Sequence, residues 1–119
     1  MDAPKIFESE YRFCLILWDN EPIGSGKLVE LCRESLGWSK ATTYTVIRRL
    51  SERGVLKNEN TIVSSLISKE EAQKHRLEEM MEETFEGSMP AFIAAFSKSK
   101  LTRREVDQLK ALIDSFEED

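Results

Sequence analysis

The stretch of the chain that decides the fold is residues 39–63, SKATTYTVIRRLSERGVLKNENTIV. Ser39 can cap a helix and Gly54 can end one, so we predict a helix over residues 40–53. After Gly54 the pattern changes to short β-rich segments at 55–57 and 61–63, separated by a polar turn at 58–60. A two-stranded hairpin is therefore expected directly after the helix. The spacing of its apolar and β-branched residues predicts that the helix buries Thr43, Val46, Ile47 and Leu50.

Two further helices are predicted before this stretch. The first spans about residues 8–19 and ends ahead of Pro22, and the second begins near residues 24–26, with Ser25 as its cap, and ends at Gly37. Three helices followed by a hairpin are the plan of a winged helix-turn-helix, whose third helix enters the major groove of DNA. The expected buried residues are Tyr11, Cys14, Leu15 and Trp18 in the first helix and Leu28, Leu31, Cys32 and Leu36 in the second.

The rest of the chain is predicted to be helical. Capping boxes at residues 68–71 and 102–105 open two amphipathic helices, and a short apolar helix over 91–96 lies between them after a break at Gly87. The predicted fold class is therefore mainly α with a small β-hairpin. Residues 1–68 would form the winged helix-turn-helix DNA-binding domain and residues 69–119 a helical dimerisation region.

The last helices expose more apolar surface than so short a region can cover. A twofold interface would bury the same patch on each copy, and folding back onto the winged helix in a monomer is the open alternative. The residues predicted for a homodimer interface are Leu77, Met80, Met81, Phe85, Phe92, Phe96, Leu109, Leu112, Ile113 and Phe116.

The charge distribution favours DNA binding although the formal net charge is −5. Residues 1–57 carry nine Lys and Arg against eight Asp and Glu, whereas residues 58–119 carry eight against fourteen. The most basic window is residues 38–57, which contains five Lys or Arg residues and a single acidic residue, Glu52. A local basic face can bind phosphate even on an acidic protein.

Other classes of function find little support in the composition. Cys14 and Cys32 lie on apolar stripes without ligand partners at metal spacing, and His75 stands alone among charged residues. We predict no enzymatic activity, no metal and no cofactor. The N-terminus lacks a signal-peptide pattern, and no apolar run is long enough to span a membrane, so we expect a cytoplasmic protein without direct membrane binding.

In the order and spacing of its short sequence motifs, the chain resembles the penicillinase repressor (BlaI/MecI) family of bacterial transcriptional regulators. The resemblance rests on residues 8–11 leading to 17–18, 21–23, 37–39, 42–50, 53–54, 68–71, 85–88 and 101–102. It implies a homodimeric repressor that binds an inverted-repeat operator and controls β-lactamase or other antibiotic-resistance genes. It also implies a membrane sensor-protease system that cleaves the repressor before a Phe matching Phe96, which here follows Ala95 where relatives have Asn.

The predicted DNA contacts lie mainly on the third helix. Arg48 is expected to contact guanine, because its planar fork matches the two major-groove acceptors of that base, and Arg49 is expected on phosphate. A winged helix that binds a protein partner, without sequence-specific DNA binding, is the alternative, and the salt dependence of DNA binding separates the two. The full predicted DNA-binding set is Lys40, Thr42, Tyr44, Thr45, Arg48, Arg49 and, on the wing, Lys57.

Overall fold

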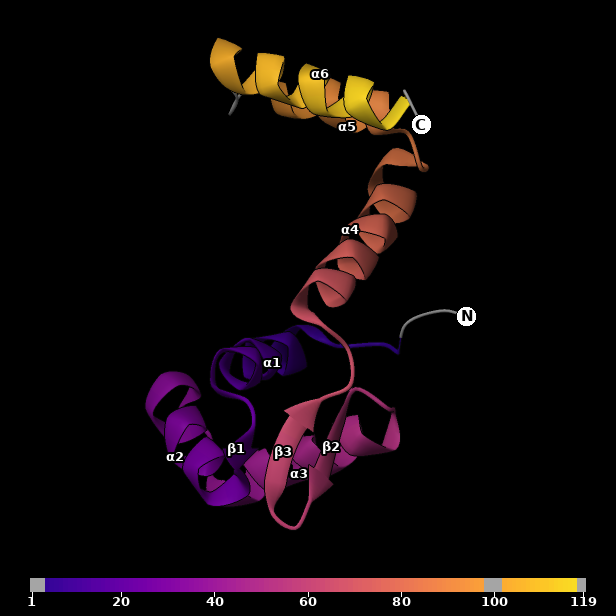
Figure 1. Cartoon of the computed structure of the whole chain (residues 1–119). Helices are drawn as coiled ribbons and strands as arrows, with labels where there is room; N and C mark the ends of the chain where they lie inside the picture. Colours follow the sequence, from indigo (N-terminus) through magenta and orange to yellow (C-terminus); the bar gives the residue numbers. More distant parts are fainter. Residues whose placement is uncertain (1–3, 98–101, 118–119) are drawn as a thin grey trace. The chain divides into compact units, whose positions relative to one another are not determined.

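A computed structural model describes residues 4–97 and 102–117, without the side chains of residues 97, 113 and 115–117. The chain divides into two compact units, Met1–His75 and Arg76–Asp119. The first unit contains helices and a small sheet (Figure 1). In the second unit, the described regular elements are helices. In chain order the elements are α1 (Glu8–Asn20), β1 (Ile23–Gly24), α2 (Ser25–Leu36), α3 (Lys40–Glu52), β2 (Leu56–Glu59), β3 (Ile62–Ser65), α4 (Lys69–Phe85), α5 (Met89–Ser97) and α6 (Arg103–Glu117).

The buried face of α1 differs from the prediction. Phe13 and Leu17 are fully buried together with Cys14, while Tyr11, Leu15 and Trp18 are only half-buried. The apolar residues of α1 are distributed around most of its circumference, so their spacing in the sequence does not identify one buried face. Packing selects it instead, and the Phe13 ring stacks on Trp38 with centroids 5.9 Å apart.

A helix-turn-helix forms from α2 and α3 as predicted, but of the residues predicted to be buried in α2 only Leu28 and Cys32 are, while Leu31 and Leu36 are half-buried. Gly37 ends α2 in the left-handed conformation (φ 69°), which costs glycine little because it has no Cβ. The Ser39 Oγ accepts a hydrogen bond from the Thr42 amide at 3.1 Å and so caps α3. At the start of α2, however, the N-cap is Gly24, and the predicted cap Ser25 is the first helical residue. All four residues predicted for the buried face of α3 are buried.

The sheet has three antiparallel strands in the order β1-β3-β2, one more than the predicted hairpin. The added strand, β1, is only two residues long and pairs Ile23 with Val63. The hairpin turn is also displaced from the predicted residues 58–60, since Asn58 and Glu59 belong to β2. Asn60 and Thr61 form the turn with φ of 52° and 65°, the conformation that matches strand twist in a two-residue hairpin.

The core of the first unit lies between the three helices and the buried side of the sheet (Figure 1). Leu28 of α2, Leu50 of α3 and Val63 of β3 are all completely buried in it. Both cysteines contribute to this core as predicted, and burial raises the pKa of Cys14 to about 12 and that of Cys32 to about 11. Because the thiolate is the reactive form, these side chains act as apolar packing.

The second unit contains most of α4 and the helices α5 and α6. At the predicted break Glu86 and Gly87 adopt positive φ, and the rings of Phe85 and Phe92 meet edge to face with centroids 5.5 Å apart. The predicted capping box of α6 is present, because the Thr102 Oγ1 accepts from the Glu105 amide and the Glu105 carboxylate accepts from the Thr102 amide. Within the described part of the chain, no helix is both long and apolar enough to cross a membrane.

Candidate nucleic-acid interface

The exposed face of α3 carries the predicted DNA contacts. Lys40, Thr42, Tyr44, Arg48 and Arg49 are exposed and Thr45 is half-buried. At about 100° per residue, Arg48 and Thr45 point away from the buried face, and Arg49 and Tyr44 flank them on either side. The structure therefore gathers these side chains on one helical surface, as expected from their spacing.

Arg48 and Arg49 are the two arginines that this surface offers to an anion, in addition to Lys40 at the start of the helix. Among the described residues, no hydrogen bond or ion pair engages either guanidinium. Arginine presents a fixed fork of donors that matches the paired acceptors of guanine and the oxygens of phosphate. Since neither side chain has to leave an internal partner, both can contact DNA at little cost to the fold.

Two hydroxyl contacts define the N-terminal part of this face. The Ser39 Oγ donates to the Thr42 Oγ1 at 3.0 Å, which holds Thr42 at the start of α3. The Tyr44 hydroxyl lies 3.3 Å from the Ser25 Oγ, and either oxygen can be the donor. Ser25 is buried, so Tyr44 connects the exposed face of α3 to the beginning of α2. The Tyr44 side chain is therefore oriented before any DNA is present.

The wing formed by β2 and β3 offers little positive charge. The Lys57 Nζ lies 3.8 Å from the Glu59 carboxylate two residues along the same strand, and both side chains are exposed. The wing is nevertheless fixed in place, because the Ser25 amide donates to the Thr61 carbonyl at 2.8 Å. Lys57 can thus reach a phosphate, but Glu59 opposes the attraction.

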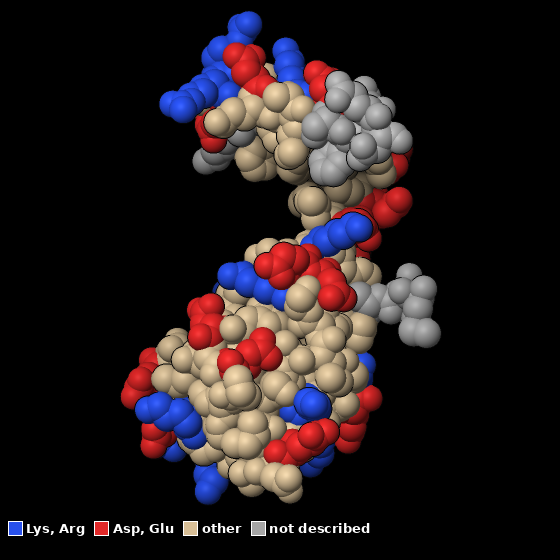
Figure 2. All heavy atoms as spheres, in the orientation of Figure 1, with Lys and Arg blue, Asp and Glu red and all other residues tan. Residues whose placement is uncertain are grey.

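Charge on the neighbouring surface is mixed. Figure 2 shows the face of the first unit on which the strands lie, and Lys and Arg are interspersed there with Asp and Glu. At physiological salt, interactions between exposed charges are largely screened beyond a distance of about 8 Å. The face drawn in Figure 2 therefore presents no continuous basic surface to a polyanion.

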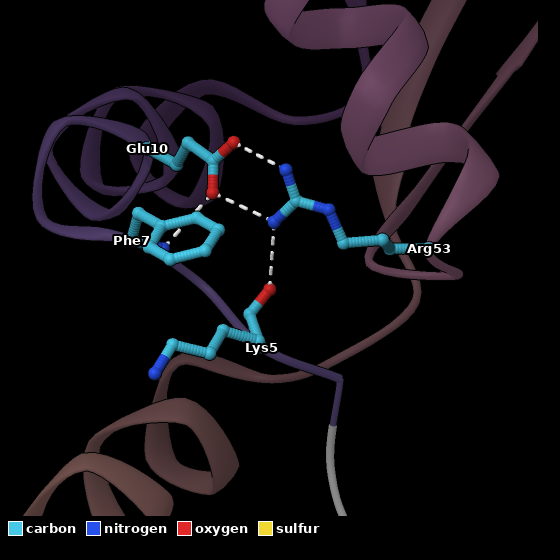
Figure 3. Close-up of polar contacts among 4 residues, drawn as sticks. All are labelled: Lys5, Phe7, Glu10 and Arg53. Atoms are coloured by element: carbon cyan, nitrogen blue, oxygen red, sulfur yellow. Dashed lines mark hydrogen bonds and ion pairs between the residues drawn. The ribbon is translucent and has the colours of Figure 1, made fainter.

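One basic residue of the predicted window is engaged inside the protein. Arg53, the C-cap residue of α3, forms a two-pronged ion pair with Glu10 of α1 (Figure 3). This contact was not predicted, and the only sequence signal for it is an acidic residue on an otherwise apolar side of α1. The basic window therefore supplies one cation fewer to the surface than its composition indicates.

The residues predicted for a dimer interface lie on α4, α5 and α6 and differ in exposure. Leu77, Met80, Phe96 and Leu112 are exposed, while Met81 is buried within the single chain. Phe85, Phe92 and Leu109 are half-buried, and the side chains of Ile113 and Phe116 lie outside the described residues. The predicted cleavage residues Ala95 and Phe96 are exposed near the end of α5.

The described residues place no candidate metal site beside this surface. Within residues 4–97 and 102–117, no three His, Cys, Asp or Glu side chains come close enough together to hold a metal ion. His75 is half-buried in α4.

Known proteins resemble the chain in both sequence and fold. The sequence matches the profile of the family described as Penicillinase repressor over residues 6–115. It is 22% identical over 115 residues to the methicillin resistance regulatory protein MecI of Staphylococcus aureus (strain Mu50 / ATCC 700699), and the match covers 92% of this chain and 94% of that protein. The fold resembles Bacillus licheniformis BlaI, whose solution structure holds the monomeric form in complex with the blaP half-operator. That likeness has a TM-score of 0.52 at 20% identity and covers 59% of this chain and 90% of the other.

Proposed function

This chain belongs to the penicillinase repressor family of DNA-binding transcriptional repressors, and we propose that it binds an inverted-repeat operator as a homodimer, with α3 in the major groove of each half-site. The observation that carries the proposal is the exposed face of α3, on which Arg48 and Arg49 have no hydrogen-bond or ion-pair partner among the described residues. Arg48 would read a guanine, and Arg49 would bind a phosphate beside it.

The remaining contacts would fix the register of the protein on the duplex. Lys40 and Thr42 lie at the N-terminus of α3, where the helix dipole and free amides favour an anion. Tyr44 would bond or stack on the sugar-phosphate backbone, and Thr45 would contribute its hydroxyl near the bases. Lys57 would make a weak contact from the wing because Glu59 lies beside it.

The homodimer would form through the C-terminal unit. Leu77 on α4, Phe96 on α5 and Leu112 on α6 expose apolar surface that a second copy could bury. Two copies related by a twofold axis would present two α3 helices, which is the symmetry of an inverted repeat.

The genes under control would include those for antibiotic resistance, because the MecI relative is named a methicillin resistance regulatory protein. A repressor acts where its operator DNA is, so the compartment that we propose is the cytoplasm. We also propose that the activity is non-enzymatic. A sensor protease that cuts at Ala95–Phe96 would have to unwind the end of α5, since proteases bind extended chain.

The proposal is tested by enriching random duplex DNA on the purified full chain and then titrating the enriched duplex at increasing salt. We expect an inverted repeat to be enriched. The logarithm of its affinity should fall linearly with the logarithm of the salt concentration, with a slope of about 0.9 for each neutralised phosphate. Weak binding without enrichment of any sequence would contradict it and would favour the protein-interaction alternative.

A further inference from the structure

Arg53 lies in the most basic window of the sequence, yet its side chain turns back toward the N-terminal segment and α1. We propose that the Glu10–Arg53 ion pair is a positioning device that sets α3 for operator reading, and that Arg53 itself does not contact DNA. The inference rests on the proposed function of α3. It adds to that function a pair of specificity-determining residues outside the DNA-contacting surface.

The geometry of the pair is tightly specified (Figure 3). The Arg53 Nη1 donates to the Glu10 Oε1 at 2.8 Å and to the Lys5 carbonyl at 3.0 Å, while Nη2 donates to the Glu10 Oε2 at 2.6 Å. The Phe7 amide donates to the same Glu10 Oε1 at 2.9 Å, and the guanidinium carbon lies 5.2 Å from the centroid of the Phe7 ring. Both carboxylate oxygens, the guanidinium plane and its aromatic cover are thus fixed together.

This ion pair connects the C-terminal end of α3 to the N-terminal end of α1. Arg53 caps the C-terminus of α3, and Glu10 lies in the first turn of α1, 43 residues away in sequence. A rotation of α3 about its axis would pull the Arg53 fork off the carboxylate. The same rotation would move Arg48, which lies on the same rigid helix. The ion pair therefore restricts the orientation in which Arg48 meets a base.

Positioning accounts for the pair better than stability does. Glu10 is 5% exposed, so its carboxylate has lost most of its water. The cost of that desolvation offsets much of the attraction in buried ion pairs, and well-packed apolar residues often replace such pairs without loss of stability. An apolar pair cannot reproduce the fixed orientation of the guanidinium plane, or its fixed distance from the carboxylate, that the two hydrogen bonds impose.

The pair also acts on the neighbouring predicted phosphate contact. The positive charge of Arg49 contributes to lowering the pKa of Glu10, after the larger effects of the Arg53 and Phe7 contacts. Arg49 is therefore near enough to Glu10 for the two opposite charges to attract each other. Removal of Glu10 would take away this internal attraction but would leave the positive charge that Arg49 presents to a phosphate.

The test replaces the pair by apolar residues of similar size, Glu10→Leu with Arg53→Met, in the full chain. We expect the melting temperature to change little. The ratio of affinity for the enriched operator to affinity for random duplex should fall about 5- to 150-fold, which is the value of one bidentate base contact. The slope of affinity against salt is expected to stay unchanged, because no phosphate contact is removed. Arg12→Met, at an exposed arginine of α1, is the matched control and should alter neither quantity.

Two outcomes would overturn the inference. An unchanged affinity ratio would show that α3 is positioned without the pair, and a reduced salt slope would show that Arg53 binds phosphate. If the double variant does not fold, Arg53→Lys decides, because it keeps the charge and removes the fork. The expected ratio is again lower at an unchanged salt slope, and a wild-type ratio would overturn the inference. Failure of the proposed function is distinguishable, because the wild-type chain would then enrich no operator.

Discussion

Replacement of Arg48 by alanine tests the assignment of the reading residue. Arg48 is exposed on α3 and has no hydrogen-bond or ion-pair partner among the described residues, so its removal leaves no orphaned group in the free protein. The change in unfolding free energy should therefore stay within about 0.5 kcal/mol, as for other surface substitutions. Any larger change in operator affinity would then come from the interface.

The expected loss of affinity follows from the bond that Arg48 would make to the base. A bidentate arginine–guanine contact discriminates against other bases by about 1–3 kcal/mol, so a single half-site should lose about 5- to 150-fold in affinity. A dimer on a complete operator contains two copies of Arg48, and the loss would double to about 2–6 kcal/mol if the half-sites are independent.

Fluorescence anisotropy with labelled duplexes measures both the loss and the base preference. We expect Arg48→Ala to bind the enriched operator and variants of one base pair in each half-site with nearly equal affinity. Arg49→Ala, at the adjacent residue, should instead weaken binding to all sequences and lower the salt slope by about 0.9 for each phosphate that is no longer neutralised. Unchanged affinity and unchanged base preference in Arg48→Ala would refute the role of Arg48.

Three further predictions concern the interface between copies, the wing and the acid stability. Leu112→Glu should yield a monomer in sedimentation at micromolar concentration with weaker operator binding, whereas Gln108→Glu on the same helix should not, and a persisting Leu112→Glu dimer would argue against this interface. Glu59→Lys, which removes the opposing charge beside Lys57, should raise affinity for any duplex and steepen its salt dependence; equal salt slopes would mean that the wing does not reach phosphate. The Arg53 contact holds the pKa of Glu10 below its ordinary value of 4.5, so the stability gained is present above pH 4.5 and is lost as pH falls through the lowered pKa. Thermal melts should accordingly show a steeper loss of melting temperature below pH 4.5 in the wild type than in Glu10→Gln, and parallel curves would contradict the assignment.

The parts of the fold that the sequence predicts well are those governed by local rules. The start and buried face of α3 follow from one serine cap and a regular apolar spacing, and both agree with the structure. The breaks at Gly37 and Gly87 also follow from local backbone preference, since both residues adopt positive φ. Local interactions of this kind act within a few residues and are therefore visible in the sequence.

The parts that the sequence does not predict depend on contacts between distant segments. Strand β1 is too short to carry a pattern and exists because it pairs with β3. The inward face of α1 is chosen by packing, since Phe13 and Tyr11 are both suitable core residues. The hairpin turn contains Thr61 at positive φ, a conformation that β-branched residues rarely adopt, so turn propensity placed it too early.

The same distinction applies to the candidate interface. The exposed cations of α3 could be named from helical spacing alone, and the structure places them on one face. The engagement of Arg53 could not, because its partner Glu10 is 43 residues away and neither residue has a spacing that identifies the other. Composition counts charges, and only the fold shows which of them are already paired.

The most direct test of the central claim, that α3 reads DNA, is an NMR titration of the isotope-labelled full chain with its enriched operator duplex. We expect the side-chain Nε–H signals of Arg48 and Arg49 and the amides of α3 to shift most, while the Nε–H signal of Arg12 on α1 stays in place. Shifts confined to α1 or to β2 and β3, with α3 unperturbed, would contradict the claim.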